Sequence, residues 1–217
     1  MILMTIKCII IDLGDVLIEL DFSRFFNDVI TPSPFNKPQA PIMLEFFRQS
    51  DTYHQGKITD EEFYKQACEI LGACSLDQKQ FYVSFNSILN DLNSDMVELI
   101  RKIKSSNNYK LICMSNINSS HWKYLKKQKW DIWELFDEFI LSHEIHMTKP
   151  DPKMFELALE KAGCKPEEVL FIDDGLNNVR SAQEMGINSI RFIGLDNLVE
   201  ELQKYNIKLS SKKRKNK

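Results

Sequence analysis

Four polar clusters, far apart in the chain, carry the side-chain types that phosphate chemistry requires. A carboxylate can attack phosphorus, a hydroxyl and an amide can bind phosphoryl oxygens, an ammonium can neutralise charge, and a carboxylate pair can bind a divalent cation. Three of the clusters follow short apolar runs, and the fourth lies in a turn rich in proline. The clusters are, in chain order, Asp12, Ser115–Asn116, Lys149 and Asp173–Asp174.

The apolar runs predict strands that end at these polar clusters. The runs are Cys8–Ile11, Leu111–Met114 and Val169–Ile172, and short unbroken runs of this kind are typical of strands buried on both faces of a parallel sheet. In open parallel sheets, ligands bind at the rim formed by the carboxyl ends of the strands. We therefore expect the clusters to converge on one cleft at that rim.

Strand and helix patterns alternate from Tyr109 onward, which predicts a parallel sheet with helices on both faces. The expected strands are 109–114, 139–141, 169–172 and 187–193, and the expected helices are 119–129, 151–163, 177–185 and a last one from Asp196. The predicted fold class is therefore α/β, with a Rossmann-like core.

Between Ile18 and about Ser94 the pattern changes to aromatic-rich helical segments, with no convincing strand. The expected helices are 22–30, 42–50, 59–71 and 76–89. Thr59 and Glu62 have the spacing of a capping box. An insert directly after the first strand predicts a helical cap over Asp12. We expect a core of residues 1–18 and 95–208, a cap of residues 19–94, and a basic, disordered tail of residues 209–217.

The composition favours a soluble, cytoplasmic enzyme domain. The 217 residues are 43% hydrophobic, with 28 basic and 31 acidic residues, so no global field argues for nucleic acid. The five cysteines are scattered without a C-x-x-C pair, so neither a disulfide framework nor a zinc site is expected. No signal peptide is recognisable and no apolar run approaches the roughly 20 residues of a membrane span. We expect a monomer or homodimer.

The four clusters resemble, in order, the four motifs of the haloacid dehalogenase-like (HAD) hydrolase superfamily. The motif-bearing segments are Asp12–Leu17, Ser115–Asn118, Lys149–Pro152 and Ile172–Asp174. The resemblance covers roughly residues 5–18 and 94–205, and the insert takes the position of a class I cap. Gly14, Ser115–Asn118 and Tyr53–Thr59 look like the bacterial glucose-1-phosphatase-type branch. The resemblance implies a Mg²⁺-dependent phosphatase that acts on a small phosphorylated metabolite, with a sugar phosphate as first candidate, through an aspartyl phosphate.

The resemblance also implies a role for each cluster. Asp12 would be the nucleophile, and Lys149 would neutralise charge during transfer. Cations are needed because a dianionic phosphate 4 Å from a carboxylate is repelled by roughly 8 kcal/mol at an effective dielectric constant of 20. Ser115 and the backbone amide of Asn116 would bind the phosphate. The implied Mg²⁺ ligands are Asp12, the carbonyl of Gly14, Asp174 and, directly or through water, Asp173, with Asn178 in the outer shell.

Two residues depart from the family pattern. Gly14 stands where most HAD phosphatases have the acid–base Asp, and Asp15 would point in a different direction. His146 stands where relatives commonly have Gly, and we expect it to be a turn residue that faces solvent. We expect His54 and His121 each to be structural or exposed, with substrate contact as the alternative. The candidates for substrate contact in the cap are Tyr53, His54 and Lys57.

Two alternative functions remain open. A metal-free haloacid dehalogenase would use the same nucleophile and tolerate Gly14, but it has no use for the acidic pair Asp173–Asp174. A degenerate HAD-like binding or regulatory protein is also suggested by Gly14. The presence of all four motif residues, Asp12, Ser115, Lys149 and Asp174, argues against it.

Overall fold

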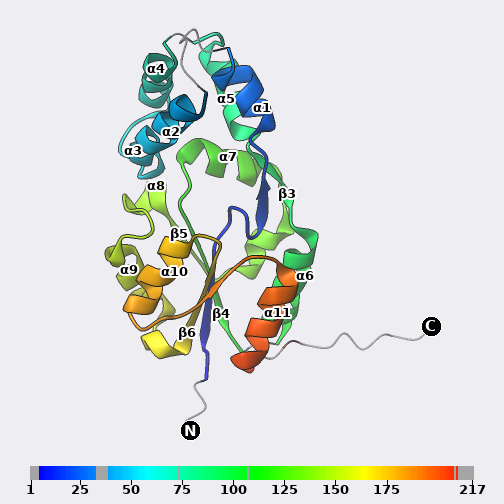
Figure 1. Cartoon of the computed structure of the whole chain (residues 1–217). Helices are drawn as coiled ribbons and strands as arrows, with labels where there is room; N and C mark the ends of the chain where they lie inside the picture. The colour runs from blue at the N-terminus through cyan, green and yellow to red at the C-terminus, as the bar shows by residue number, and fades with distance from the viewer. Residues whose placement is uncertain (1–4, 33–38, 73, 107, 208, 210–217) are drawn as a thin grey trace, which may run out of the picture.

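A five-stranded parallel sheet forms the centre of the molecule, in the strand order β5-β4-β1-β6-β7 (Figure 1). The computed structural model describes residues 5–32, 39–72, 74–106, 108–207 and 209. The strands are β1 (Cys8–Ile11), β4 (Lys110–Ser115), β5 (Glu138–Leu141), β6 (Val169–Asp173) and β7 (Asn188–Arg191). Central strand β1 pairs with both neighbours, so that Ile11 lies opposite Cys113 and Ile172. The predicted α/β class is confirmed.

Helices cover both faces of this sheet. Alternate strand residues point to opposite sides, and because they are apolar on both sides, both faces need cover from water. Ile9 and Ile11 share one core cluster with residues of α6 (Ser94–Ser105) and α11 (Leu195–Lys204). Cys8 and Ile10 pack on the other side, in a cluster with residues of α9 (Pro152–Ala162) and α10 (Leu176–Glu184). The shorter elements around the sheet are α7 (Ser119–Lys127), α8 (Ser142–Ile145), η2 (Asp131–Leu135) and η3 (Pro166–Glu168). This double cover explains the unbroken apolar runs.

A helical lobe, which we call the cap, lies beyond the carboxyl edge of the sheet (Figure 1). Its helices are α1 (Ser23–Phe25), the π-helical η1 (Phe26–Ile30), α2 (Gln39–Gln49), α3 (Asp51–His54), α4 (Asp60–Leu71) and α5 (Gln78–Asn86). They enclose their own hydrophobic cluster, in which Phe46, Phe63 and Phe85 are almost fully buried. The capping box at Thr59 and Glu62 is present. These contacts support the predicted cap, although its limits at 19 and 94 stay a prediction.

Two short strands connect the cap to the core, so the prediction that the insert contains no strand was wrong. β2 (Ile18–Leu20) and β3 (Leu89–Leu92) pair antiparallel, with Leu20 opposite Leu89. With three and four residues, these strands are too short for a period of two to stand out in the sequence.

The cysteine pattern gave a second wrong expectation. Cys68 in α4 and Cys74 just beyond it form a disulfide bond, which ties the end of that helix to the following segment. Cys8 and Cys113 are free and buried in their strands, as expected. The basic tail at residues 210–217 lies outside the described residues. Within the described part of the chain, no helix has the length and apolar character needed to cross a membrane.

Candidate active site

Three carboxylates meet at the carboxyl edge of the sheet. Asp12 directly follows β1, Asp173 is the last residue of β6, and Asp174 comes next. One oxygen from each lies within 4.8 Å of the others. Asp12 and Asp173 are buried, whereas Asp174 is half-buried. The strand ends therefore bring together the acidic residues that the sequence places 161 positions apart.

Lys149 links the two buried carboxylates and is itself 4% exposed. Its Nζ lies 2.8 Å from Asp12 Oδ1 and donates to Asp173 Oδ2 at 2.6 Å and to the carbonyl of Met114 at 3.0 Å. Burial alone disfavours the ammonium, but the charges of Asp12 and Asp173 outweigh it and raise the pKa of Lys149. The side chain is therefore a fixed positive charge beside Asp12.

The carboxylates carry more negative charge than Lys149 can balance. Burial raises the pKa of Asp12 to about 7, against the opposing effect of the Lys149 ammonium. Burial also raises the pKa of Asp174, and the negative charges of Asp173 and Asp15 raise it further. Further positive charge at this point would favour the ionised carboxylates. The donor set therefore suits a hard divalent cation, which prefers oxygen ligands.

Asp173 is held in place by three donors. Besides Lys149, its Oδ1 accepts from the amide of Gly175 at 2.8 Å and from Asn178 Nδ2 at 2.9 Å. A Cβ at Gly175 would lie 2.8 Å from that Asn178 nitrogen, so a larger residue here would displace the Asn178 side chain from Asp173. Asn178 thus contacts a candidate ligand, which is consistent with its predicted outer-shell role.

Ser115 and Asn116 follow one another at the end of β4 but have different environments. Ser115 is buried, whereas Asn116 is exposed. The Asn116 side chain donates to the carbonyl of Lys149 at 2.8 Å and accepts from its amide at 2.7 Å. The Asn116 side chain therefore positions Lys149. The backbone amide of Asn116 and the Ser115 hydroxyl remain as the predicted phosphate-binding groups.

Gly14 begins a tight turn directly after the candidate nucleophile. The amide of Asp15 donates to the carbonyl of Ile18 at 2.8 Å, and the amide of Ile18 donates to Leu13 at 2.7 Å. Asp15 is exposed and has a φ of 52°. A Cβ at Gly14 would meet Leu20 Cδ1 at 3.4 Å, which is ordinary contact. A side chain is thus sterically tolerated at Gly14.

A histidine–asparagine network between the cap and the core was not foreseen. Asn118 Nδ2 lies 3.4 Å from His54 Nε2 and 3.2 Å from His121 Nδ1. Because an amide NH₂ only donates, both ring nitrogens must accept. The remaining nitrogens face carbonyls, His54 Nδ1 that of Ser50 at 2.9 Å and His121 Nε2 that of Phe85 at 3.1 Å. All four ring nitrogens are therefore occupied, and both imidazoles are neutral.

Burial accounts for the neutral state of both rings. It lowers the pKa of His54, and together with the nearby His54 it lowers the pKa of His121 to about 3. His121 also stacks on Phe85 with ring centroids 4.3 Å apart. His121 is thus structural, as expected. The signal for the network is absent from the sequence because His54 and Asn118 are 64 positions apart.

Further contacts hold the cap against the core. Asp60 accepts from Tyr53 at 2.9 Å and from Ser119 of α7 at 2.8 Å. A Cβ at Gly56 would lie 2.2 Å from the carbonyl oxygen of His143, so the backbones approach closely there. His146 is exposed, as expected, but its Nδ1 also lies 2.8 Å from a cap carbonyl, that of Gln55. The structure therefore shows the cap docked on the core.

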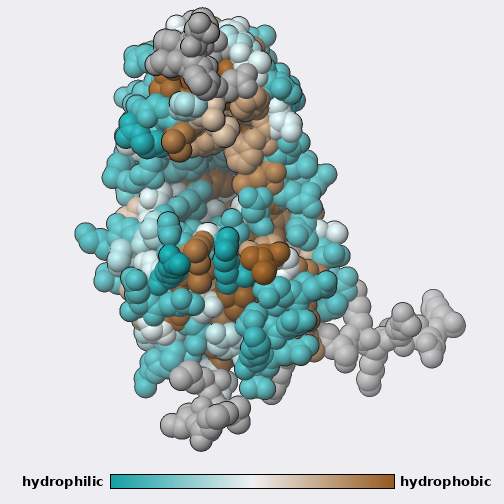
Figure 2. Space-filling view, viewed as in Figure 1, coloured by the Kyte–Doolittle hydropathy of each residue, from teal (hydrophilic) through white to brown (hydrophobic). Residues whose placement is uncertain are grey.

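An apolar cavity of about 210 Å³ lies between the cap and the core, and its lining includes Leu13, the residue that follows Asp12. Leu13, Gly14 and Ser115 line it on the core side, and the histidines of the network line it as well. Figure 2 shows hydrophobic residues where the cap meets the core. Of the predicted cap contacts, His54 lines this cavity, Tyr53 is buried among the cap aromatics, and Lys57 is exposed.

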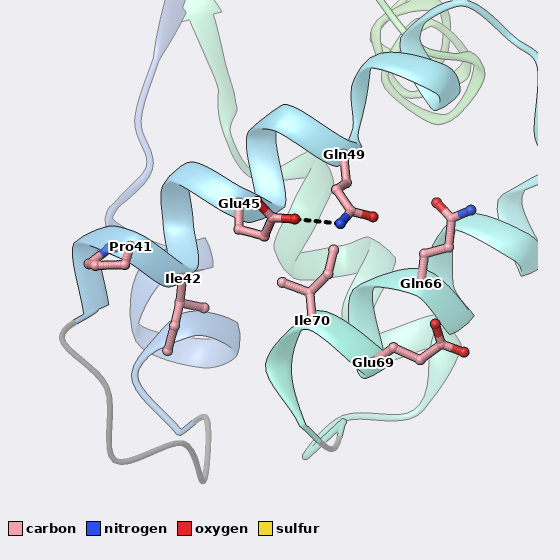
Figure 3. Close-up of a pocket in the computed structure, with 7 residues that line it drawn as sticks. All are labelled: Pro41, Ile42, Glu45, Gln49, Gln66, Glu69 and Ile70. Carbon is pink, nitrogen blue, oxygen red and sulfur yellow. Dashed lines mark hydrogen bonds between the residues drawn. The ribbon is translucent and has the colours of Figure 1, made fainter.

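A second hollow, of about 350 Å³, lies within the cap between α2 and α4 (Figure 3). Glu45, Gln49, Gln66 and Glu69 line it, and Gln49 donates a hydrogen bond to Glu45. It contains none of the strand-end residues, so we assign the chemistry to the cavity beside Asp12.

A family model of haloacid dehalogenase-like hydrolases matches residues 6–186. The chain belongs to this family. A solved HAD family enzyme from Bacteroides thetaiotaomicron matches the HAD fold described here with a TM-score of 0.73 and 31% identity, covering 88% of this chain and 96% of that one. A mutant of that enzyme, solved with magnesium and inorganic phosphate, is 32% identical, with a TM-score of 0.73, over 86% of this chain and 93% of that one. The predicted superfamily and its hydrolase class are confirmed.

The characterised relatives of this HAD protein include two phosphatases of different substrates and a cyclase. D-ribitol-5-phosphate phosphatase of Bacteroides thetaiotaomicron is 23% identical over 86% of this chain and 91% of its own length. Sesquiterpene phosphatase astK of Aspergillus oryzae is 28% identical over 84% of this chain and 88% of its own length. Drimenol cyclase drtB of Aspergillus calidoustus is 28% identical over 91% of this chain, which spans 36% of drtB.

Proposed function

We propose that this protein is a Mg²⁺-dependent phosphatase that hydrolyses a small phosphate monoester through Asp12. The observation that carries the proposal is the placement of Asp12, which lies 2.8 Å from the Lys149 ammonium and within 4.8 Å of Asp173 and Asp174. A phosphate needs both a nucleophile and compensation for its charge, and this edge of the sheet offers both. The magnesium and phosphate in the mutant of the Bacteroides enzyme support the same conclusion.

Asp12, Asp174 and the carbonyl of Gly14 are the groups that we propose hold Mg²⁺, with Asp173 contributing directly or through water. The fit rests on three converging carboxylates that one ammonium does not neutralise. When bound, the ion would offset the negative charge of the phosphate and favour the ionised form of Asp12.

The protein's own residues account for the two transfer steps that we propose. In the first, an Asp12 carboxylate oxygen forms a bond to phosphorus while the ester P–O bond breaks, and the leaving oxygen takes a proton from solvent. Ser115 and the Asn116 amide would orient the phosphoryl oxygens, and Lys149 would neutralise their charge. In the second, water attacks phosphorus, the aspartyl bond breaks, and phosphate and free Asp12 result.

The substrate is not decided by the relatives' names. A sugar phosphate was the prediction from the sequence, and the ribitol-phosphate phosphatase supports it. The sesquiterpene phosphatase, which matches at higher identity, supports a different class. We therefore limit the proposal at this stage to a small phosphate monoester.

Release of inorganic phosphate from p-nitrophenyl phosphate and a panel of metabolite monoesters, with Mg²⁺ and with EDTA, tests the proposal. We expect turnover that requires Mg²⁺. The absence of turnover on every ester would favour a binding protein, and halide release from 2-haloacids in EDTA would favour the dehalogenase alternative that Gly14 permits.

A further inference from the structure

The cavity beside Asp12 has walls that suit hydrocarbon rather than hydroxyl groups. On the cap side it is lined by Phe22, Phe47, Phe85 and Ile88, and on the core side by Leu13 and Ile117, with Leu20 of the connecting strand β2 between them. Leu13, Gly14 and Ser115 belong to the same lining, so the cavity is continuous with the proposed phosphate site. A phosphate held by Ser115 would therefore place its ester group in this cavity.

Most polar side chains of the lining are already engaged in hydrogen bonds within the protein, and the Ser115 hydroxyl is assigned above to the phosphate. His54 and His121 use all their ring nitrogens, on Asn118 and on the carbonyls of Ser50 and Phe85. The Asn116 side chain is bonded at both ends to the main chain of Lys149. Most of the hydroxyl groups of a polyol that enter the cavity would therefore lose their water without gaining a partner, which is costly.

Gly14 adds to the apolar space. The usual acid–base carboxylate at this position would extend from a Cβ that lies 3.4 Å from Leu20 Cδ1, at the wall of the cavity. Without that side chain, the lining next to the leaving oxygen is backbone and leucine. Phe22, in T-shaped contact with Phe47 at 5.5 Å, is 38% exposed, so this wall borders solvent.

We infer that the cavity holds the leaving group of the substrate, and that this group is an apolar alkyl, alkenyl or aryl group rather than a sugar or polyol. The inference rests on the phosphatase function proposed above. A cavity of about 150 Å³ accommodates benzene, so the 210 Å³ here accommodates a somewhat larger hydrocarbon group. The substrate class is thus the phosphate monoesters of small hydrophobic alcohols and phenols.

A matched pair of substrates tests this inference on the wild-type protein. Pentyl phosphate and ribitol 5-phosphate are both primary esters with the same number of carbons, and they differ in their hydroxyl groups. We expect kcat/KM to favour pentyl phosphate by at least about a hundredfold, because each unpaired hydroxyl costs about tenfold or more. Along methyl, propyl and pentyl phosphate, kcat/KM should rise by about fourfold per methylene.

A cavity-filling variant locates the effect. Leu20→Phe enlarges a side chain of the lining, and we expect it to lower kcat/KM for heptyl phosphate at least about tenfold more than for methyl phosphate. Leu44→Phe is the matched control, because Leu44 is 71% exposed on α2 and outside the lining. It should leave the ratio unchanged.

The outcomes separate this inference from the proposed function. If no ester releases phosphate, the phosphatase proposal fails and the inference fails with it. If phosphate is released but ribitol 5-phosphate is used as well as pentyl phosphate or better, the phosphatase stands and the apolar class is overturned. The wild-type pair gives this answer even if Leu20→Phe does not fold.

Discussion

Acidification from pH 7 to pH 5 should weaken the fold through His121. This ring is 7% exposed, stacks on Phe85 and accepts from Asn118, all in its neutral form. Its pKa in the folded protein is about 3, whereas an unfolded histidine has a pKa of about 6.5. Below pH 6.5 the unfolded chain therefore gains a proton that the folded chain does not, and stability falls as the pH falls, until the folded pKa is reached.

The size of this effect follows from the two pKa values. One pH unit corresponds to about 1.4 kcal/mol, so 1.5 units between pH 6.5 and pH 5 give about 2 kcal/mol from this one ring. His54, the other ring on Asn118, also has a lowered pKa and acts in the same direction. The pH dependence of the wild type should therefore decrease in His121→Gln without disappearing.

Urea unfolding at pH 7 and pH 5, for wild type and His121→Gln, measures the difference. We expect the wild type to lose about 2 kcal/mol more than the variant between the two pH values. The comparison cancels the carboxylates that both proteins share. An equal loss in both proteins, or an NMR titration of the His121 ring with a midpoint above pH 6, would refute the account of the buried network.

Further substitutions test the active site. Asp12→Asn should reduce turnover to below about one per cent of wild type. The control Asp15→Asn should keep turnover within tenfold of wild type, because Asn suits the left-handed backbone at this position as well as Asp does. Equal losses in the two variants would contradict a nucleophile at Asp12. Lys149→Met leaves two buried carboxylates without their ammonium partner and should lower the free energy of unfolding by about 3–5 kcal/mol. The control Lys123→Met, at an exposed ion pair, should lower it by about 0–1 kcal/mol. Urea unfolding measures both. Gly14→Asp should raise kcat/KM for alkyl phosphates by up to about 10²–10⁴ and less for aryl phosphates, whose leaving groups need less protonation; an unchanged ratio would show that the acid–base function comes from elsewhere.

The sequence allowed the sheet and the convergence of the acidic residues to be predicted. Both depend on strands buried on two faces, which produce unbroken apolar runs such as Cys8–Ile11, and on the general rule that such strands end at one rim. Asp12 and Asp173 could be placed at the same rim because each directly follows an apolar run that predicts a strand. Lys149 could be added only through the family motif, since a single lysine carries no pattern of its own.

The lining of the cavity could not be predicted because it comes from side chains that fold together across the cap and the core. Phe47 belongs to a helix, α2, and Ile117 to the loop between β4 and α7, and nothing local shows that both face one cavity. The acceptor role of His54 depends in the same way on Asn118, which is distant in the sequence. Short strands β2 and β3 were missed because pairing between them, rather than local pattern, makes them strands.

The pairing of β2 with β3 has a mechanical consequence. The chain enters the cap through one of these strands and leaves through the other, and the two are hydrogen-bonded to each other. Stretching one connection would break the ladder, whereas bending or twisting the ribbon as a unit preserves it. The paired strands thus form a hinge, which favours rotation of the cap over its translation. Leu20 and Leu89 lie on this hinge and also in the cavity wall, so a rotation that admits substrate also reshapes the pocket that receives it.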